Sequence, residues 1–240
     1  AKACASADVV VASHPYLYPE IRAVWRGPLV YEAHNVEADM KASVLADALA
    51  RRRLAATTAL TRVEQVEGDC ALDAALILSV SEAERSALAK RYGLDVSKIQ
   101  LAPNGTDTFR IPYTDPERRA AQKVRYGLAD RFTALFIGSL HGPNIEAAHH
   151  IIGLARQCPS MDFLLLGSVC RASFGKMPCN CHCLGQVSEA EKRHWLSLAD
   201  CALNPMTSGA GSNLKLMEYA AAGIPIVTTA FGNRGVDLAA

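Results

Sequence analysis

A glycine-containing stretch near the end of the chain, residues 206–219, combines residue types suited to binding a phosphorylated ligand. Gly209 and Gly211 have no Cβ atom, so an anion can approach the backbone closely around them. The residues after this corner predict a helix that begins near Asn213. Free amide groups and the positive dipole end at a helix start attract anions, so the backbone of Gly211, Ser212 and Asn213 is a candidate phosphate site.

Three side chains could complete this site. Asn213 could cap the helix, and Lys215, in its first turn, could reach a phosphate. Glu218 lies three residues further on a neighbouring face, where it could accept hydrogen bonds from sugar hydroxyls. The alternative is a tight turn of an ordinary α/β protein with a solvated lysine and glutamate.

The two familiar phosphate loops do not fit this corner. It lacks the Gly-Lys-Ser/Thr sequence of nucleoside-triphosphate loops, and Leu214 stands where a dinucleotide loop has its third glycine. Thr228 and Thr229 occupy the place where a ribose-binding acidic residue would end the next strand. A nicotinamide-dependent enzyme is therefore disfavoured.

A second set of polar residues follows an apolar strand in the first half of the chain. His34 ends that strand and precedes Asn35 and Glu37. His34 could face a ligand beyond the strand end, or it could cap the following helix. His14 and His141 occupy similar places after other strands and are weaker candidates.

Four cysteines, Cys170, Cys179, Cys181 and Cys183, lie close together in the sequence. Thiolates bind zinc, but alternate residues of a strand would form a row of thiols about 6–7 Å apart rather than a tetrahedron. We therefore expect these cysteines to pack as small apolar residues and predict no metal site, with a structural metal or a redox pair as alternatives.

Strand-like and helix-like segments alternate along the chain. Strands are expected at 7–13, 29–33, 76–80, 99–102, 133–138, 163–167, 183–185, 201–205 and 224–229. Helices are expected at 36–72, as one helix or two, and at 82–91, 145–157, 189–198 and 214–222. The sequence Ser-Glu-Ala-Glu occurs at 81–84 and at 188–191, and each copy predicts a capping box.

This alternation predicts an α/β fold with parallel sheets. A charged, proline-containing stretch near 109–131 separates two such series. We therefore expect two Rossmann-like domains, residues 1–115 and 116–240, each partial. Ligands of such sheets bind beyond the carboxyl ends of the strands, and a two-domain arrangement would place them in the cleft.

The 240 residues include 25 basic and 24 acidic residues, a balance that gives no reason to expect nucleic acid as a partner. No apolar run approaches the length of a membrane span, and no signal peptide is visible. Since the chain begins without Met, we expect an internal fragment, incomplete at both ends. Arg51, Arg52 and Arg53 suggest a solvated helix face, with an anionic membrane or an acidic acceptor as the alternative.

The segment 209–229 resembles the donor-site signature of GT-B glycosyltransferases, and most closely that of the group-1 (family four) retaining enzymes. Further segments match in the same order. They are 31–35, 79–82, 103–107, 136–139 with 143–144, 185–188, and 199–200. The resemblance therefore extends over nearly the whole chain, in the expected GT-B architecture.

The resemblance implies transfer of a sugar, with retention, from a nucleotide-diphosphate sugar held by the second domain. It implies no cofactor and no metal, because backbone amides and basic side chains would neutralise the leaving diphosphate. Glu218 matches the residue that holds the ribose hydroxyls. The donor site would be completed by Gly138, Ser139, Asn144, Gly209, Gly211, Ser212, Asn213 and Lys215.

The chain departs from the family pattern at two places. Ala210 stands where many members have a first acidic residue. Ser139 and Asn144 stand in the region where many have an arginine and a lysine that clamp the phosphates. Lys215 or Arg234 could supply the missing positive charge.

On the acceptor side, the resemblance makes His34 the candidate catalytic residue, with His14, Asn35 and Glu37 beside the acceptor. That acceptor would be a glycan, a lipid-linked sugar or a small molecule, and the protein would be cytoplasmic, with a peripheral contact at the inner face of the membrane among its expected partners. The alternatives are a non-catalytic nucleotide- or glycan-binding GT-B module and a GT-B nucleotide-sugar epimerase.

Overall fold

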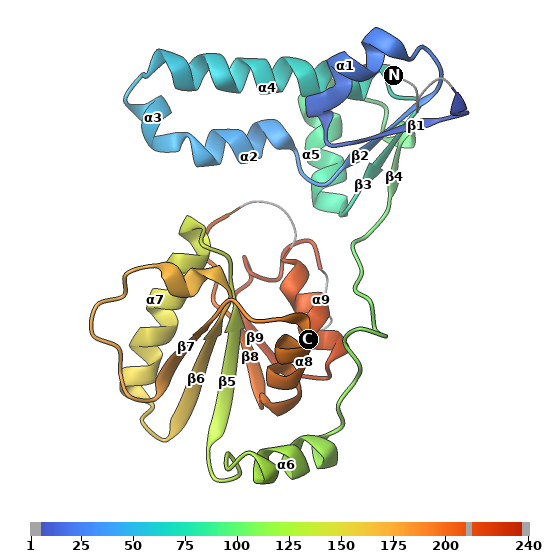
Figure 1. The fold of residues 1–240 in the computed structure, drawn as a ribbon. Coiled ribbons are helices and arrows are strands. Elements are labelled where there is room, and N and C mark those ends of the chain that lie inside the picture. The colour runs from blue at the N-terminus through green and yellow to red at the C-terminus, as the bar shows by residue number, and fades with distance from the viewer. Residues whose placement is uncertain (1–5, 210–212, 237–240) are drawn as a thin grey trace. The chain divides into compact units, whose positions relative to one another are not determined.

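The computed structural model describes residues 6–209 and 213–236, which divide into two compact units. The first unit includes residues 6–104, coloured blue to green in Figure 1, and the second begins at Gly105. In the described part of the chain, no helix has both the length and the apolar character needed to cross a membrane.

The first unit has a four-stranded parallel sheet in the order β1-β2-β3-β4. The apolar residues of alternating strand positions face one side, as in β2, where Leu29, Tyr31 and Ala33 are buried. The strands are β1 (Val10–Ser13), β2 (Leu29–Ala33), β3 (Leu76–Ser79) and β4 (Ile99–Leu101). Sequential strand order and parallel pairing confirm the predicted Rossmann-like arrangement.

The helical segment between β2 and β3 is not one or two helices but three, α2, α3 and α4. The chain turns at Arg52, whose φ of 51° is left-handed, and Arg53 is extended where α4 begins. Figure 1 shows α2 and α4 reaching away from the sheet and joined by α3 at their far end. The helices of this unit are η2 (Pro15–Leu17), α1 (Tyr18–Val24), α2 (Glu37–Val44), α3 (Ala46–Ala50), α4 (Leu54–Asp73), α5 (Glu82–Tyr92) and η3 (Val96–Lys98).

The capping box expected at 81–84 is only half formed. The Ser81 hydroxyl accepts the Glu84 amide at 3.2 Å, as predicted. The Glu84 carboxylate, however, accepts the amide of Val36 at 2.8 Å, which connects α5 to the start of α2. At 188–191, both halves of the predicted box are present.

The second unit has a five-stranded parallel sheet in the order β7-β6-β5-β8-β9. The strand order reverses between β5 and β8, and ligands of such sheets bind in the crevice outside this reversal point. The strands are β5 (Phe132–Ile137), β6 (Met161–Leu166), β7 (Cys181–Gly185), β8 (Cys201–Asn204) and β9 (Ile226–Thr228).

Helices cover both faces of this sheet (Figure 1). The apolar face of α7, with Ile151 and Ile152, packs against β5 and β6 on one side. Leu196 of α8 with Leu216 and Tyr219 of α9 packs against the other side. The helices are α6 (Pro116–Arg125), α7 (Gly142–Gln157), η4 (Ser168–Arg171), α8 (Glu189–Leu198) and α9 (Leu214–Ala221).

The segment that connects β4 to α6 packs on the second unit. Ile111 joins its core, and the Thr114 amide donates to the Ala222 carbonyl at 3.3 Å. The buried guanidinium of Arg119 donates to the carbonyls of Thr114, Leu196, Ala199, Ala222 and Gly223. The compact units thus divide after Asn104, whereas the domain boundary expected from the sequence falls at 115/116.

Candidate functional site

The loop after β5 lies at the reversal point of the second sheet and contains Gly138. Its amide donates to the Leu166 carbonyl at 2.9 Å, and its carbonyl accepts the Val169 amide at 3.1 Å. Gly167 has a φ of 98°, and a Cβ atom there would lie 2.3 Å from the Gly138 oxygen. The loop therefore depends on a second glycine, in the neighbouring β6 loop, that allows the two backbones to approach.

Three of the predicted donor-site residues form a hydrogen-bonded chain across this crevice. The Asn144 amide nitrogen donates to the Ser139 hydroxyl at 3.0 Å, and the Lys215 ammonium donates to the Asn144 Oδ1 at 2.9 Å. The Lys215 Nζ lies 4.3 Å from the centre of the Phe136 ring, within the range of a cation–π contact. The structure thus brings together residues from the β5 loop, α7 and α9.

The charge of Lys215 lacks a counter-ion in the described structure. No ion pair joins Lys215 to a carboxylate of the described residues. Burial lowers the pKa of Lys215 to about 8. A neutral amide and an aromatic face only partly replace the water that a buried ammonium loses, so the site favours an anion.

Asn213 does not cap α9 with its side chain, contrary to the sequence-based expectation. Its amide nitrogen instead donates to the Gly232 carbonyl at 2.6 Å, and that carbonyl also accepts Asn204 at 3.0 Å. Asn213 is buried and holds the loop after β9 beside the start of α9. The predicted Gly211 and Ser212, and the departure at Ala210, lie outside the described residues.

Gly209 lies against the loop after β5. Its φ is 122°, and a Cβ atom there would lie 3.4 Å from Pro143 and 3.4 Å from the Arg234 guanidinium. The preceding hydroxyls of Thr207 and Ser208 donate to Glu146 of α7 at 2.7 and 2.9 Å. These bonds lower the pKa of Glu146 and connect the glycine-containing corner to α7.

Glu218 is ion-paired with Lys192 of α8 at 2.8 Å. Sequence reasoning missed Lys192, because a lysine on a charged helix face has no motif that separates it from its solvated neighbours. Burial acts to lower the pKa of Lys192, but hydrogen bonds to Glu218 and Glu189 raise it, so the amine stays charged.

In the first unit, the four predicted acceptor-side residues lie together. The Glu37 carboxylate, 1% exposed, contacts His14 Nδ1 at 3.0 Å and accepts Asn35 at 3.3 Å and the Tyr16 hydroxyl at 2.6 Å. The rings of His14 and His34 lie 4.7 Å apart. Tyr16 is the member that sequence reasoning missed.

The contact with Glu37 involves one ring nitrogen of His14. The Nδ1 atom of His14 makes the contact with Glu37, and Nε2 takes no part in it. His14 has a φ of 68°, an unfavourable backbone conformation for a residue with a side chain. Such strain is often found at functional sites.

The buried carboxylate of Glu67 accepts hydrogen bonds from the start of α2, next to this cluster. Glu67 accepts the amides of Glu37 and Ala38 at 2.7 and 2.9 Å, and the hydroxyls of Tyr31 and Tyr92 at 3.1 and 2.7 Å. Burial raises the pKa of Glu67, and these hydrogen bonds oppose that shift. Glu67 therefore accepts the free amides in the first turn of α2. The sequence analysis had considered His34 for this capping role.

The expected apolar packing holds for only two of the four clustered cysteines: Cys181 is buried and Cys170 is partly buried in the core beside α7, whereas Cys179 and Cys183 are exposed. The Cys170 thiol donates to the Leu165 carbonyl at 3.1 Å. Within the described residues, no group of three His, Cys, Asp or Glu side chains could hold a metal ion. His141 stands at the N-cap of α7 but makes no capping bond there.

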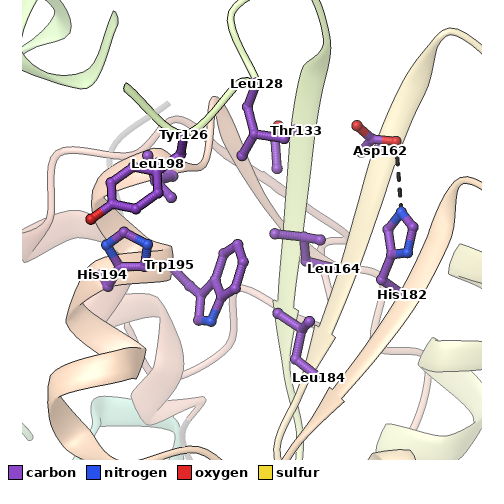
Figure 2. A pocket seen from close by; sticks show the side chains of 10 residues that line it. All are labelled: Tyr126, Leu128, Thr133, Asp162, Leu164, His182, Leu184, His194, Trp195 and Leu198. Atoms are coloured by element: carbon purple, nitrogen blue, oxygen red, sulfur yellow. Dashed lines mark ion pairs between the residues drawn. The ribbon is translucent and has the colours of Figure 1, made fainter. Parts of the chain in front are cut away.

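A separate cavity of about 330 Å³ lies on the α8 side of the second sheet (Figure 2). Trp195 and four leucines contribute most of its wall, and His182 faces Asp162 at 3.8 Å across two strands. Its lining residues are Tyr126, Leu128, Thr133, Asp162, Leu164, His182, Leu184, His194, Trp195 and Leu198. None of the predicted site residues lines this cavity.

A comparison with known families finds a match within the second unit. Residues 131–238 match the family described as glycosyl transferases group 1. This part of the chain is similar to group 1 glycosyl transferases. The matched part includes the loop after β5, the glycine-containing corner and α9.

Relatives of known name match a larger part of the chain. A D-inositol 3-phosphate glycosyltransferase of Paenarthrobacter aurescens is 28% identical over 229 residues, which are 89% of this chain and 53% of that protein. This chain thus spans about half the length of that curated relative.

Solved structures establish the fold. HepE of Anabaena in complex with UDP matches 95% of this chain and 61% of its own, with a TM-score of 0.66 and 17% identity. Sucrose-phosphate synthase of Thermosynechococcus elongatus matches 94% and 57%, with a TM-score of 0.68 and 17% identity. The expected GT-B fold is confirmed, and the two parallel sheets are its Rossmann-like units.

Proposed function

We propose that the protein is a glycosyltransferase that moves a sugar from a nucleotide-diphosphate sugar to a hydroxyl-bearing acceptor, with retention at the anomeric carbon. The donor diphosphate binds the second unit at the crevice between β5 and β8. The match to group 1 glycosyl transferases and the UDP complex of the HepE structure support this proposal.

The observation that carries the proposal is the buried charge of Lys215 at the reversal point of the sheet. Asn144 holds its ammonium at 2.9 Å, and its pKa is lowered to about 8 because burial removes water without supplying an anion. A diphosphate would supply that anion. As the glycosidic bond to the phosphate breaks, Lys215 and nearby backbone amides would stabilise the negative charge that develops on the leaving group.

The acceptor would bind the first unit, at the cluster of His14, His34, Asn35 and Glu37. Glu37 fixes His14 so that Nε2 remains free to accept from an acceptor hydroxyl. His34, 3.2 Å from the Ser13 hydroxyl, is the second imidazole at this surface and the proposed catalytic residue. Glycans, lipid-linked sugars and small polyols all present such hydroxyls.

Calorimetric titration of the 240-residue chain with UDP, ADP and GDP tests the donor site. We expect one nucleotide to bind at micromolar Kd and Lys215→Met to weaken it at least about tenfold, because one charge-assisted contact contributes about 1.5–3 kcal/mol. Lys176→Met, at an exposed lysine of the same unit, is the matched control. Absence of binding by a folded sample, or equal loss in both variants, would refute the donor site.

The fate of the sugar distinguishes the alternatives. Incubation of the chain with the matching nucleotide sugar and simple glycoside acceptors should yield a product that keeps the donor's anomeric configuration, as nuclear magnetic resonance can show. Binding without turnover would favour a non-catalytic module. Conversion of the nucleotide sugar to its epimer, with no transfer, would identify an epimerase.

We also propose that the far end of the α2–α4 hairpin contacts an anionic membrane surface at the cytoplasmic face. Val44 and Leu54 are 60% and 81% exposed there, and Arg51, Arg52 and Arg53 are exposed between them. Apolar side chains beside a basic cluster suit an interface rich in anionic lipid.

Sedimentation with phosphatidylglycerol vesicles, compared with phosphatidylcholine vesicles, tests this contact. Replacing the three arginines by serine should weaken binding to the anionic vesicles about a hundredfold, since each contributes about 1 kcal/mol near such a surface. Arg62→Ser, at an exposed position further along α4, serves as control. Equal sedimentation of all forms would contradict the proposal.

A further inference from the structure

The ion pair between α8 and α9 joins the proposed ribose-binding carboxylate to a lysine that no motif selects. The Lys192 Nζ contacts Glu218 Oε1 at 2.8 Å and Glu189 Oε2 at 3.0 Å. The side chains of Lys192 and Glu218 are only 16% and 24% exposed, whereas that of Glu189 is 68% exposed. Across residues 6–209 and 213–236, Lys192 is the only side chain paired with the Glu218 carboxylate.

The stability of α8 explains this lysine only in part, through the ion pair with the exposed Glu189 three residues earlier. Lys192 is the fourth residue of a helix that begins at Glu189, and a cation in the first turn opposes the helix dipole. Its long side chain also loses rotamer freedom when it is fixed to a partner on another helix. The position of Lys192 has a physical rationale if its function is to hold the Glu218 carboxylate in place for a ligand.

We propose that Lys192 is a positioning residue of the nucleotide site. By holding Oε1 of Glu218, it fixes the carboxylate in one orientation and leaves Oε2 to accept hydrogen bonds from the ribose hydroxyls. The carboxylate then needs no reordering when the nucleotide binds, which removes part of the entropic cost of binding. This inference rests on the proposed role of Glu218 toward ribose.

The test compares a nucleoside diphosphate with its 2′,3′-dideoxy form, using whichever of UDP, ADP and GDP binds the 240-residue chain. Lys192→Met should weaken binding of the ribonucleotide about tenfold and change binding of the dideoxynucleotide less than about twofold, because residues in contact couple by about this amount. Lys192→Arg should restore most of the discrimination. Glu189→Gln, which removes only the exposed partner, should leave it unchanged.

A double variant tests whether the effect of Lys192 depends on the Glu218 carboxylate. In the Glu218→Gln background, the additional change Lys192→Met should have no further effect on the ratio of the two affinities. Thermal melting of each variant shows whether it folds, and the ratio itself is insensitive to a uniform loss of folded protein.

Four results would overturn the inference, each in a distinguishable way. If Lys192→Met weakens both nucleotides equally, the lysine acts as a general positive charge. If it strengthens ribonucleotide binding, the lysine blocks the carboxylate. If the unaltered chain binds both nucleotides equally, the proposed role of Glu218 fails first, and if it binds neither, the donor site itself fails.

Discussion

Lys215 keeps a positive charge where water is largely excluded, and this should be visible in the pH dependence of nucleotide binding. Its pKa in the free protein is lowered to about 8 by burial. A bound diphosphate favours the ammonium form and raises that pKa. Nucleotide affinity should therefore fall as the pH rises above about 8, by up to about tenfold per pH unit toward about pH 10.

Calorimetry across this range checks the prediction. Lys215→Arg is the informative control, because an arginine stays charged at every pH used. Its affinity should not decline over the same interval, whatever its absolute value. A decline of the same slope in the arginine variant would show that another group is responsible.

Some residues of the candidate sites could be predicted from the sequence, and others could not. The hydrogen bond between Asn144 and Lys215 joins residues 71 positions apart. Lys215 was predicted from the glycine-containing corner, whereas Ser139 and Asn144 were expected only from the family resemblance. Lys192 and Tyr16 were not, because their roles come only from which helix or turn packs beside them. Patterns of sequence select loops well, but partners across the fold have no local signal.

At the scale of elements, α2 is held at its start by a carboxylate from α4. Glu67 accepts two backbone amides and two tyrosine hydroxyls while fully buried. Glu67→Gln keeps the size of the side chain but replaces one accepting oxygen by a donor. It should lower the free energy of unfolding by about 1–3 kcal/mol, because a buried donor loses its partner.

Urea denaturation of the chain measures this change. Glu64→Gln, on the same helix at a side chain that is 40% exposed, should cost less than about 0.5 kcal/mol. Equal costs for the two variants would contradict the assigned role of Glu67.

The approach of the β5 and β6 loops depends on Gly167. A Cβ atom there would lie 2.3 Å from the Gly138 oxygen, and φ is 98°. Gly167→Ala should destabilise the protein by about 2–4 kcal/mol and displace the Gly138 loop, which would also weaken nucleotide binding. Melting and calorimetry of one preparation give both effects.

Gly93 provides the matched comparison. It ends α5 with a φ of 63°, and nothing lies within 4 Å of a Cβ atom built there. Gly93→Ala should cost only the left-handed strain of about 1–2 kcal/mol, with nucleotide binding intact. A larger cost at Gly93 than at Gly167 would show that backbone approach is not the deciding factor.

Element predictions failed where the chain changes direction without glycine or proline. The segment 36–72 predicts one helix or two, but the structure has three, and Arg52 takes a left-handed conformation between α3 and α4. The two copies of Ser-Glu-Ala-Glu also differ. The copy at 188–191 forms the complete capping box, whereas Glu84 of the first copy accepts the distant amide of Val36. In both cases, contacts with residues distant in the sequence determine the local structure, and local propensity does not predict them.

At the scale of the whole molecule, the two proposed binding surfaces belong to different units. His14, His34 and Glu37 come from the first sheet and its following loops, and Ser139, Asn144 and Lys215 from the second. The alternation of strands and helices predicted this division, because each parallel sheet needs its own series of crossovers. The exact boundary was not readable, since residues 105–115 look like a linker but include Ile111, which packs in the core of the second unit.

This division predicts that nucleotide binding needs only the second unit. Residues 105–240 contain a five-stranded sheet with helices on both faces. Arg119 donates to the Thr114 carbonyl of the entering segment and to four carbonyls at the ends of α8 and α9. Expressed alone, this segment should fold cooperatively and bind the nucleotide within about threefold of the affinity of the whole chain, a difference of about 0.7 kcal/mol. Lys215→Met should weaken binding at least about tenfold in both forms. A folded segment that no longer binds would mean that the first unit contributes directly to the donor site, and a segment that begins at 116 should be less stable because it lacks the buried Ile111.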